Sequence, residues 1–241
     1  MSLYTIADLH LSTHSETNKS MEVFGTRWMD YIQRISDNFK KLVTDSDTVV
    51  IPGDISWALS LDEAVSDLKF IDSLPGKKIL GKGNHDFWWC TMKKHEQLFK
   101  KLDIKTISFL FNNAHETDEF IIAGTRGWYN DSSATNAPSG TDFDKLTERE
   151  RLRLKMSLDA AMALKERSPE KEILTFMHFP PVWCGQESGG LVELLSDYGV
   201  KRVYFGHIHG NYSVEPSFEH KGITMHLVSA DYLKFIPKIV K

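Results

Sequence analysis

The sequence predicts an α/β domain, and three features of the 241-residue chain indicate it. Short apolar segments alternate with amphipathic segments of helical period through the first half of the chain. The second half is richer in apolar segments typical of strands. Hydrophobic residues make up 41% of the chain and charged residues 26%, a balance typical of globular proteins. Alternation of strands and helices in such a chain is typical of α/β folds.

The strands and helices of the first half are predicted from their periodicity. Each expected strand is a short apolar run, and each expected helix carries apolar residues three or four positions apart. Pro75-Gly76 ends the second of these helices. We therefore expect strands over residues 2–7, 48–51 and 78–81, and helices over residues 27–43, 59–74 and 92–102.

The second half adds further strands and two helices. Thr147-Glu148-Arg149-Glu150 has the pattern of a capping box, so we expect a helix over 147–167 to begin there. Residues 130–145 are rich in Asn, Ser, Asp, Thr and Gly, which predicts a surface loop. Loop and helix together form an insertion at about 130–167 that is either a lid or an outer-layer helix, and we favour the lid. The other expected elements are strands 104–111, 119–123, 172–177, 202–205 and 223–229, and a helix over 191–198.

Length, charge and cysteine content limit the class of protein. A chain of 27.6 kDa is long enough for one large domain, which we expect to span residues 1–241. Its net charge of −4 gives no general attraction to nucleic acid or to an anionic membrane, which disfavours nucleic acid as a partner. No apolar stretch approaches the roughly 20 residues of a membrane span. The N-terminus lacks the basic region of a signal peptide, and Cys90 and Cys184 form no metal-binding spacing, so we expect a cytoplasmic protein.

Polar side chains repeatedly follow the predicted strands at the point where each strand ends. The carboxyl ends of parallel strands meet in one crevice, where α/β proteins bind ligands. Two carboxylates, several imidazoles and an amide without a thiolate suit manganese, iron, zinc or cobalt better than calcium. The residues in these positions are Asp8, His10, Asp54, Asn84, His85, His178, His207 and His209.

The order and spacing of these residues resemble the motifs of the calcineurin-like metallophosphoesterase superfamily. The resemblance extends over residues 8 to 209 and comprises Asp8-x-His10, Gly53-Asp54, Gly83-Asn84-His85-Asp86, His178 and Gly206-His207-x-His209. It implies a four-layer α-β-β-α sandwich of two mixed sheets and a centre of two divalent metal ions. One ion would be held by Asp8, His10 and His209, the other by Asn84, His178 and His207, with Asp54 bridging the two.

The same resemblance implies hydrolysis of phosphoester bonds by a hydroxide that bridges the metals. Two divalent ions can stabilise both the attacking and the leaving oxygen of an in-line displacement. Asn84, which we also expect to contact the substrate, binds a metal without cancelling its charge. His85 would lie beside the phosphate as the catalytic residue, where it could stabilise phosphoryl oxygens or protonate the leaving group.

Two departures from related enzymes narrow the expected substrate. Ser/Thr protein phosphatases of this superfamily carry an aspartate and an arginine where this chain has Trp57 and Ala58, which disfavours that activity. Purple acid phosphatases place a metal-binding tyrosine at the position of Trp57, so their chemistry is not expected either. Asp86 replaces a glutamate that many relatives have, a change we regard as tolerable. A phosphodiesterase or small-molecule phosphatase is favoured over the alternatives, a nuclease or a non-catalytic metal-binding scaffold.

Other candidates have a functional and a structural interpretation. Arg126, between two glycines, could hold a phosphate or form a surface salt bridge. The tryptophans near the motifs could form an aromatic rim or pack in the core: Trp57, Trp88, Trp89, Trp128 and Trp183. His226 alternates with apolar residues and is interpreted as structural. We expect four other histidines to be solvated: His14, His95, His115 and His220.

Overall fold

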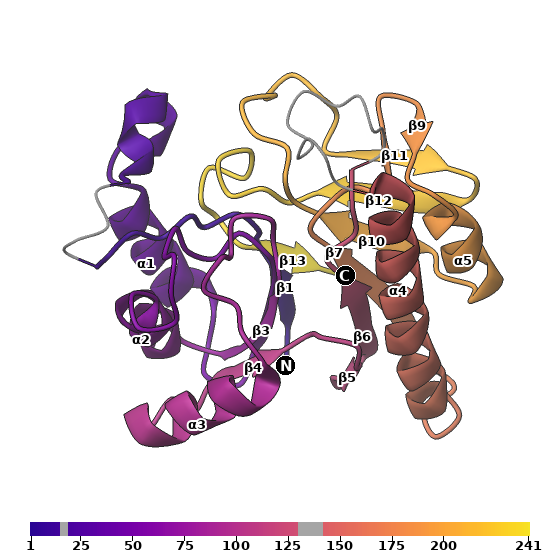
Figure 1. Ribbon diagram of the computed structural model, residues 1–241, viewed down its shortest axis with the longest axis horizontal. Helices are drawn as coiled ribbons and strands as arrows, with labels where there is room; N and C mark the ends of the chain where they lie inside the picture. Colours follow the sequence, from indigo (N-terminus) through magenta and orange to yellow (C-terminus); the bar gives the residue numbers. More distant parts are fainter. Residues whose placement is uncertain (15–18, 130–141) are drawn as a thin grey trace.

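Two mixed β-sheets lie face to face between two layers of helices in the computed structural model (Figure 1), which describes residues 1–14, 19–129 and 142–241. The first sheet has the strand order β13-β1-β2-β3-β4. Strands β1 to β4 are parallel, and β13 pairs with β1 in the antiparallel sense. The strands are β1 (Leu3–Thr5), β2 (Thr48–Pro52), β3 (Lys77–Gly81), β4 (Ile107–Phe109) and β13 (Lys238–Val240).

The second sheet has the order β11-β12-β10-β7-β6-β5, with parallel central strands and an antiparallel strand at each edge. A two-stranded ribbon formed by β8 (Val182–Trp183) and β9 (Gln186–Glu187) lies outside it. The strands of the second sheet are β5 (His115–Glu116), β6 (Phe120–Thr125), β7 (Glu172–Met177), β10 (Arg202–Phe205), β11 (Ser217–His220) and β12 (Ile223–Leu227).

Each sheet is covered on its outer face by helices from its own half of the chain (Figure 1). One apolar cluster joins the first sheet to its helices, a second joins the other sheet to its helices, and a third fills the space between the sheets. The predicted four-layer sandwich is therefore confirmed. The helices are η1 (Met21–Phe24), η2 (Thr26–Trp28), α1 (Tyr31–Leu42), α2 (Val65–Ser73) and α3 (Met92–Leu102) on one side, and α4 (Phe143–Lys165) and α5 (Leu191–Asp197) on the other.

The predicted start of the long helix at Thr147 is wrong. Helix α4 begins at Phe143, and the side chain of Asp142 caps it by accepting a hydrogen bond from the backbone N–H of Lys145 at 3.1 Å. Thr147 and Glu150 are buried inside the helix, so the apparent capping box is a pair of packed residues. Helix α4 packs on the outer face of β6.

Most of the predicted loop lies at 130–141, outside the described residues, so the lid stays a prediction. Within the described part of the chain, no helix is long and apolar enough to cross a membrane.

Lys78 is a fully buried cation in the first sheet, and its ammonium group donates hydrogen bonds to the carbonyls of Leu74 and Gly76, the latter at 2.7 Å. Lys78→Met would leave these carbonyls without a donor, and buried polar groups without partners are costly. We expect the free energy of unfolding to fall by roughly 2 kcal/mol. Chemical denaturation measures the change, with Lys77→Met at the exposed neighbouring position as control. Equal stability of the two variants would contradict the prediction.

Candidate metal centre

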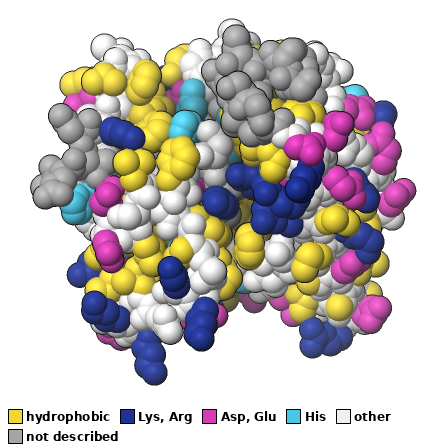
Figure 2. Space-filling view, in the orientation of Figure 1, with side chains coloured by type: hydrophobic (Ala, Val, Ile, Leu, Met, Phe, Trp, Pro, Cys, Tyr) yellow, Lys and Arg dark blue, Asp and Glu magenta, His cyan; other side chains and the backbone are white. Residues whose placement is uncertain are grey.

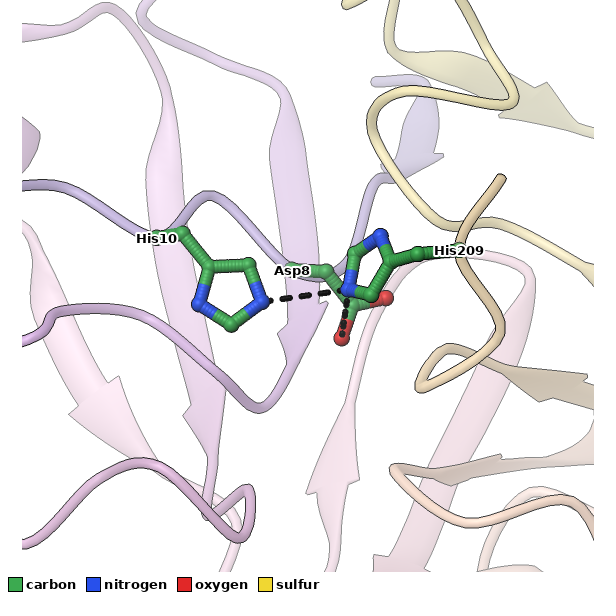
Figure 3. A group of neighbouring side chains, drawn as sticks. All are labelled: Asp8, His10 and His209. Carbon is green, nitrogen blue, oxygen red and sulfur yellow. Dashed lines mark hydrogen bonds and ion pairs between the residues drawn. The ribbon is translucent and has the colours of Figure 1, made fainter. Parts of the chain in front are cut away.

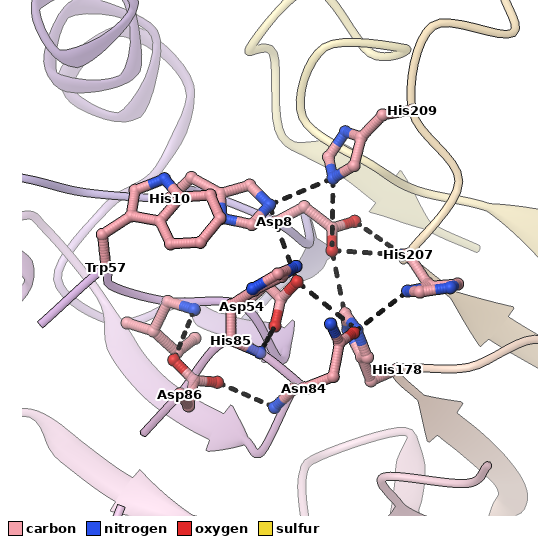
Figure 4. Close-up of polar contacts among 12 residues, drawn as sticks. Asp8, His10, Asp54, Trp57, Asn84, His85, Asp86, His178, His207 and His209 are labelled. Carbon is pink, nitrogen blue, oxygen red and sulfur yellow. Dashed lines mark hydrogen bonds and ion pairs between the residues drawn. The ribbon is translucent and has the colours of Figure 1, made fainter. Parts of the chain in front are cut away.

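The parallel strands of both sheets end at the same edge of the sandwich, and the polar residues that follow them converge there (Figure 4). The connection between the sheets is made by the backbone beyond β1. The N–H of Ala7 donates to the carbonyl of Val228 at 2.8 Å, and the N–H of Ala230 donates to the carbonyl of Ala7 at 2.9 Å. Segments that follow β1 and β12 are thereby joined, which brings ligands from the two halves of the chain together.

Asp8, His10 and His209 form the first group of donor atoms (Figure 3). The Nε2 atoms of His10 and His209 face each other at 3.1 Å. Nε2 of His209 lies 3.9 Å from Oδ1 of Asp8. Two imidazole nitrogens and a carboxylate oxygen at such distances can bind one divalent ion.

Asn84, His178 and His207 form a second group beside the first (Figure 4). Oδ1 of Asn84 lies 2.6 Å from Nε2 of His178 and 3.1 Å from Nδ1 of His207. The other ring nitrogen of His178 lies 3.5 Å from Oδ1 of Asp8, which links the two groups. An amide oxygen and two imidazole nitrogens again provide donor atoms of the kind that divalent transition metals accept.

Asp54 lies between the two groups. Its Oδ2 atom is 3.6 Å from Nε2 of His10 in the first group and 3.5 Å from Nε2 of His178 in the second. Its Oδ1 atom accepts a hydrogen bond from the backbone N–H of His85 at 2.8 Å, which fixes the carboxylate. One oxygen of Asp54 can therefore reach both donor groups.

The loops that carry these side chains have unusual backbone conformations. Asp8, His10, Asp54 and His207 all have positive φ angles, between 45° and 69°. Residues other than glycine rarely adopt this region, and each such residue costs on the order of 1 kcal/mol. Backbone strain concentrated in four residues of one cluster is typical of functional sites.

Gly83 and Asp86 hold the loop after β3 against the loop after β2. A Cβ atom on Gly83 would overlap Oδ1 and the backbone nitrogen of Asp54, so only glycine allows this approach. Asp86 is buried, and its Oδ1 accepts hydrogen bonds from the N–H groups of Ile55 and Ser56 at 2.9 and 3.2 Å. Its Oδ2 accepts the N–H of Gly83 at 2.7 Å. Asp86, whose side chain is shorter than the glutamate of many relatives, therefore reaches all three N–H groups. It thereby positions Asp54 relative to Asn84.

The donor atoms fit divalent cations. Asp8 and Asp54 are buried, and no Lys or Arg pairs with either of them in the described part of the chain. Burial raises the pKa of Asp8 to about 6 and that of Asp54 well above its usual value, because an uncompensated buried carboxylate is costly. Burial also lowers the pKa values of His10 and His178, so both are neutral with a lone pair available. Cations at the centre would compensate the carboxylates and accept the imidazole lone pairs.

His85 lies at the mouth of this centre, packed against Trp57 at a ring distance of 4.4 Å. Burial lowers the pKa of His85 to about 4. Trp57 also stacks on His10 at 4.7 Å. Among the five candidate tryptophans, Trp57 therefore contacts the centre itself, whereas Trp88 and Trp128 are buried and Trp89 and Trp183 pack against the apolar clusters.

Two residues that support His209 were not predicted from the sequence. Asp231 is buried and lies four residues beyond the end of β12; its Oδ1 atom is 2.9 Å from Nδ1 of His209. Its Oδ2 accepts hydrogen bonds from the backbone N–H of Gly210 and the hydroxyl of Tyr212, both at 3.0 Å. Trp28 packs beside the His209 ring at 5.7 Å. Asp231 thus orients His209 toward Asp8, and a carboxylate soon after a strand was the signal that could have revealed it.

Asp231→Asn is expected to lower manganese affinity roughly 10- to 100-fold, because carboxylates behind ligating histidines set ring orientation and basicity. The asparagine would also place its amide group against donors where Oδ2 now accepts. Calorimetric titration of metal-stripped protein measures the effect. Glu187→Gln, at a carboxylate that pairs with Lys221 outside the centre, is the control and should bind manganese normally. Unchanged affinity in Asp231→Asn would show that Asp231 does not support the site.

Arg126 is not free at the surface. Its Nη2 lies 3.3 Å from Oε1 of buried Glu150, and its guanidinium stacks on Trp128 at 4.6 Å.

The expectation that His95 is solvated is wrong: His95 is fully buried, with its ring 4.5 Å from that of Phe109. His226 stacks on Tyr204 at 4.7 Å, in agreement with a structural role.

Comparisons with known proteins bear on the family and the fold of the chain. The sequence profile of the calcineurin-like phosphoesterase family matches residues 1–211. No curated protein matches the chain. Among solved structures, a phosphopantetheinyl hydrolase from Mycobacterium tuberculosis is similar, with 14% identity, a TM-score of 0.52, and coverage of 99% of this chain and 95% of that one. The protein TT1561 of Thermus thermophilus is similar at 9% identity and a TM-score of 0.53, over 99% and 97% of the two chains. Likeness at this level of identity shows the fold alone.

Proposed function

This chain belongs to the calcineurin-like phosphoesterase family. From that premise we propose that it hydrolyses phosphodiesters or small phosphomonoesters with two divalent metal ions, and that both ions are manganese. Asp8, His10 and His209 would hold one ion, and Asn84, His178 and His207 the other. The family supports metal-dependent phosphoester hydrolysis in general, and the Asp and His groups of this chain are able to bind metal. The substrate, and the preference for diester or monoester, are part of the proposal.

The position of Asp54 is the observation that supports two ions best. A carboxylate oxygen within 3.6 Å of a donor in each group suits a ligand shared by two cations. Two cations satisfy both groups and leave a net positive centre that favours a phosphate anion.

The protein side chains would orient and protonate the substrate. When bound, the two cations supply Lewis acidity toward phosphate oxygens and make water a better nucleophile at neutral pH. His85, at the mouth of the centre, would as a neutral imidazole donate a hydrogen bond to a phosphoryl oxygen. Protonation of the leaving oxygen would require the bound phosphate anion to raise the pKa of His85, so that the ring carries a proton to transfer. Asn84 would hold the substrate near the second group without adding negative charge.

Trp57 and Ala58 support a small phosphoester over a phosphoprotein. Trp57 fills the space beside His10 and His85 with an apolar ring, and Ala58 is buried. Neither can orient His85 by hydrogen bonding or bind phosphate as a charged side chain would. Substrate recognition must therefore come from other residues around the centre.

Hydrolysis of bis-p-nitrophenyl phosphate and p-nitrophenyl phosphate by metal-stripped protein, before and after manganese is added, tests the proposal. We expect turnover to depend on manganese and to saturate near two ions per chain. Preference for the first compound indicates a phosphodiesterase, and preference for the second a phosphatase. If two ions bind and neither compound is cleaved, a non-catalytic metal-binding scaffold is the better account. Cleavage of single-stranded DNA alone would favour a nuclease.

A further inference from the structure

A small basic pocket lies among residues that follow β3, β4 and β6 and residues of α4. Lys82, Arg126 and Arg153 line it together with Glu150. Lys82 immediately precedes the Gly83–Asp86 loop, and the carbonyl of Arg126 accepts a hydrogen bond at 2.9 Å from the N–H of Phe179, the residue after His178. The pocket therefore adjoins two loops that carry metal-binding donors. Figure 2 shows Lys and Arg side chains gathered in the middle of this face, next to α4.

Positive charge in this pocket exceeds what Glu150 requires. Its Oε1 atom lies 3.3 Å from Arg126, 3.4 Å from Arg149 and 2.7 Å from Arg153. Arg149 lies outside the pocket, so the cations that line it are Lys82, Arg126 and Arg153; against the one carboxylate of Glu150 they leave a surplus of two positive charges. One arginine would be enough to compensate Glu150, so the others are not explained by the fold.

The cationic groups are held in place rather than left to move in solvent. Arg126 stacks on Trp128, and Arg153 lies over Phe111 at 5.4 Å. Glu150 fixes both guanidinium groups from below, and Nε of Arg126 is buried without a hydrogen-bond partner. The ammonium group of Lys82 forms no ion pair or hydrogen bond within the described residues. Fixed guanidinium groups with unused donors are suited to phosphate oxygens.

We propose that the cationic side chains around this pocket bind a second phosphate group of the substrate while the scissile phosphoester lies at the metal centre. The phosphate would lie across the opening of the pocket, because the enclosed volume of about 10 Å³ admits no more than a water-sized group. The inference rests on the proposed function and narrows it to phosphoesters that carry a further phosphate. Lys82 and Arg153 would contact that second phosphate, and Arg126 would lie between the two anions. Recognition would then come from charge in this pocket, since Trp57 and Ala58 contribute none.

Binding of alkane bisphosphonates tests the inference without requiring turnover. Calorimetry on manganese-loaded protein compares 1,4-butanebisphosphonate and its three- and six-carbon homologues with butylphosphonate, which has one anion. We expect the best bisphosphonate to bind at least about tenfold more tightly than butylphosphonate. Equal affinities, or no binding of either kind to protein that holds two ions, would overturn the inference. If the protein binds the bisphosphonate more tightly but cleaves neither p-nitrophenyl ester, the proposed hydrolysis is contradicted and the inference about the pocket is not.

A bisphosphonate could also bind more tightly because both of its phosphonate groups chelate the metal ions. Variants of the pocket distinguish this explanation from binding of the second phosphonate by the pocket. Lys82→Gln removes a cation that pairs with no carboxylate of the described residues, so we expect the variant to fold, and the preference for the bisphosphonate should fall to about threefold or less. Arg153→Gln should reduce it as well. Arg151→Gln removes the same charge from the same helix, but Arg151 pairs with Glu148, so the preference should stay unchanged. A preference that survives in Lys82→Gln and Arg153→Gln would mean chelation and would overturn the inference.

Discussion

Asp54→Asn is expected to lower manganese-dependent cleavage of bis-p-nitrophenyl phosphate by roughly a thousandfold, because charge stabilisation at the reacting phosphate would be lost. Oδ2 of Asp54 is the oxygen within reach of both donor groups, at 3.6 and 3.5 Å. Asparagine keeps the oxygen that accepts the N–H of His85 but removes the negative charge. Initial rates at saturating manganese measure turnover, and calorimetry should find one tightly bound ion instead of two.

Asp72→Asn is a matched control for this change. Asp72 accepts a hydrogen bond from the backbone N–H of Thr106 at 2.8 Å and is not among the residues of the metal centre. Its replacement should leave turnover and the number of bound ions unchanged. If Asp54→Asn retained both ions and more than a tenth of parental turnover, Asp54 would not be a shared ligand and the dinuclear arrangement would have to be revised.

That these polar residues lie close together could be predicted from the sequence, because strand ends can be recognised from local sequence. An apolar run followed by a charged residue marks a strand end, and the ends of parallel strands meet in space. Asp8, Asp54 and His178 were found this way, and the structure brings them together as expected. The pairing of the two sheets is also consistent with the family resemblance that the motifs carry.

Contacts made between distant segments could not be predicted in this way. Asp231 follows β12, and this position marks it as a candidate, but its local sequence does not specify His209 as its partner. His95 has polar sequence neighbours, yet aromatic rings from the loop after β3 and from β4 enclose it. Burial of this kind depends on which elements pack together, which a single sequence does not specify.

The start of α4 shows how a local pattern can mislead. Thr147 and Glu150 have the spacing of a capping box, but Asp142 provides the cap and both residues lie inside the helix. Glu150 is buried because it binds Arg126 and Arg153 rather than a helix terminus. Short edge strands such as β5 and β9 were missed because two-residue polar segments carry no periodic signal.

His85→Ala is expected to lower turnover roughly 100- to 10,000-fold while two manganese ions still bind. The His85 ring packs against Trp57, and its side chain forms no hydrogen bond or ion pair within the described residues. Removing it should therefore leave the donor groups and the fold intact. Thermal unfolding and metal titration check this, and steady-state rates measure the loss. A scaffold would bind its partner equally well with or without His85.

The size of the loss for different leaving groups distinguishes two roles of His85. p-Nitrophenolate leaves without being protonated, whereas an alkoxide must receive a proton as the bond to phosphorus breaks. If His85 donates that proton, His85→Ala should impair an alkyl ester far more than a p-nitrophenyl ester. If it only stabilises phosphoryl oxygens, the two losses should be equal. A variant that cleaves both esters at parental rates would show that His85 takes no part in catalysis. The metal centre would then be active without it.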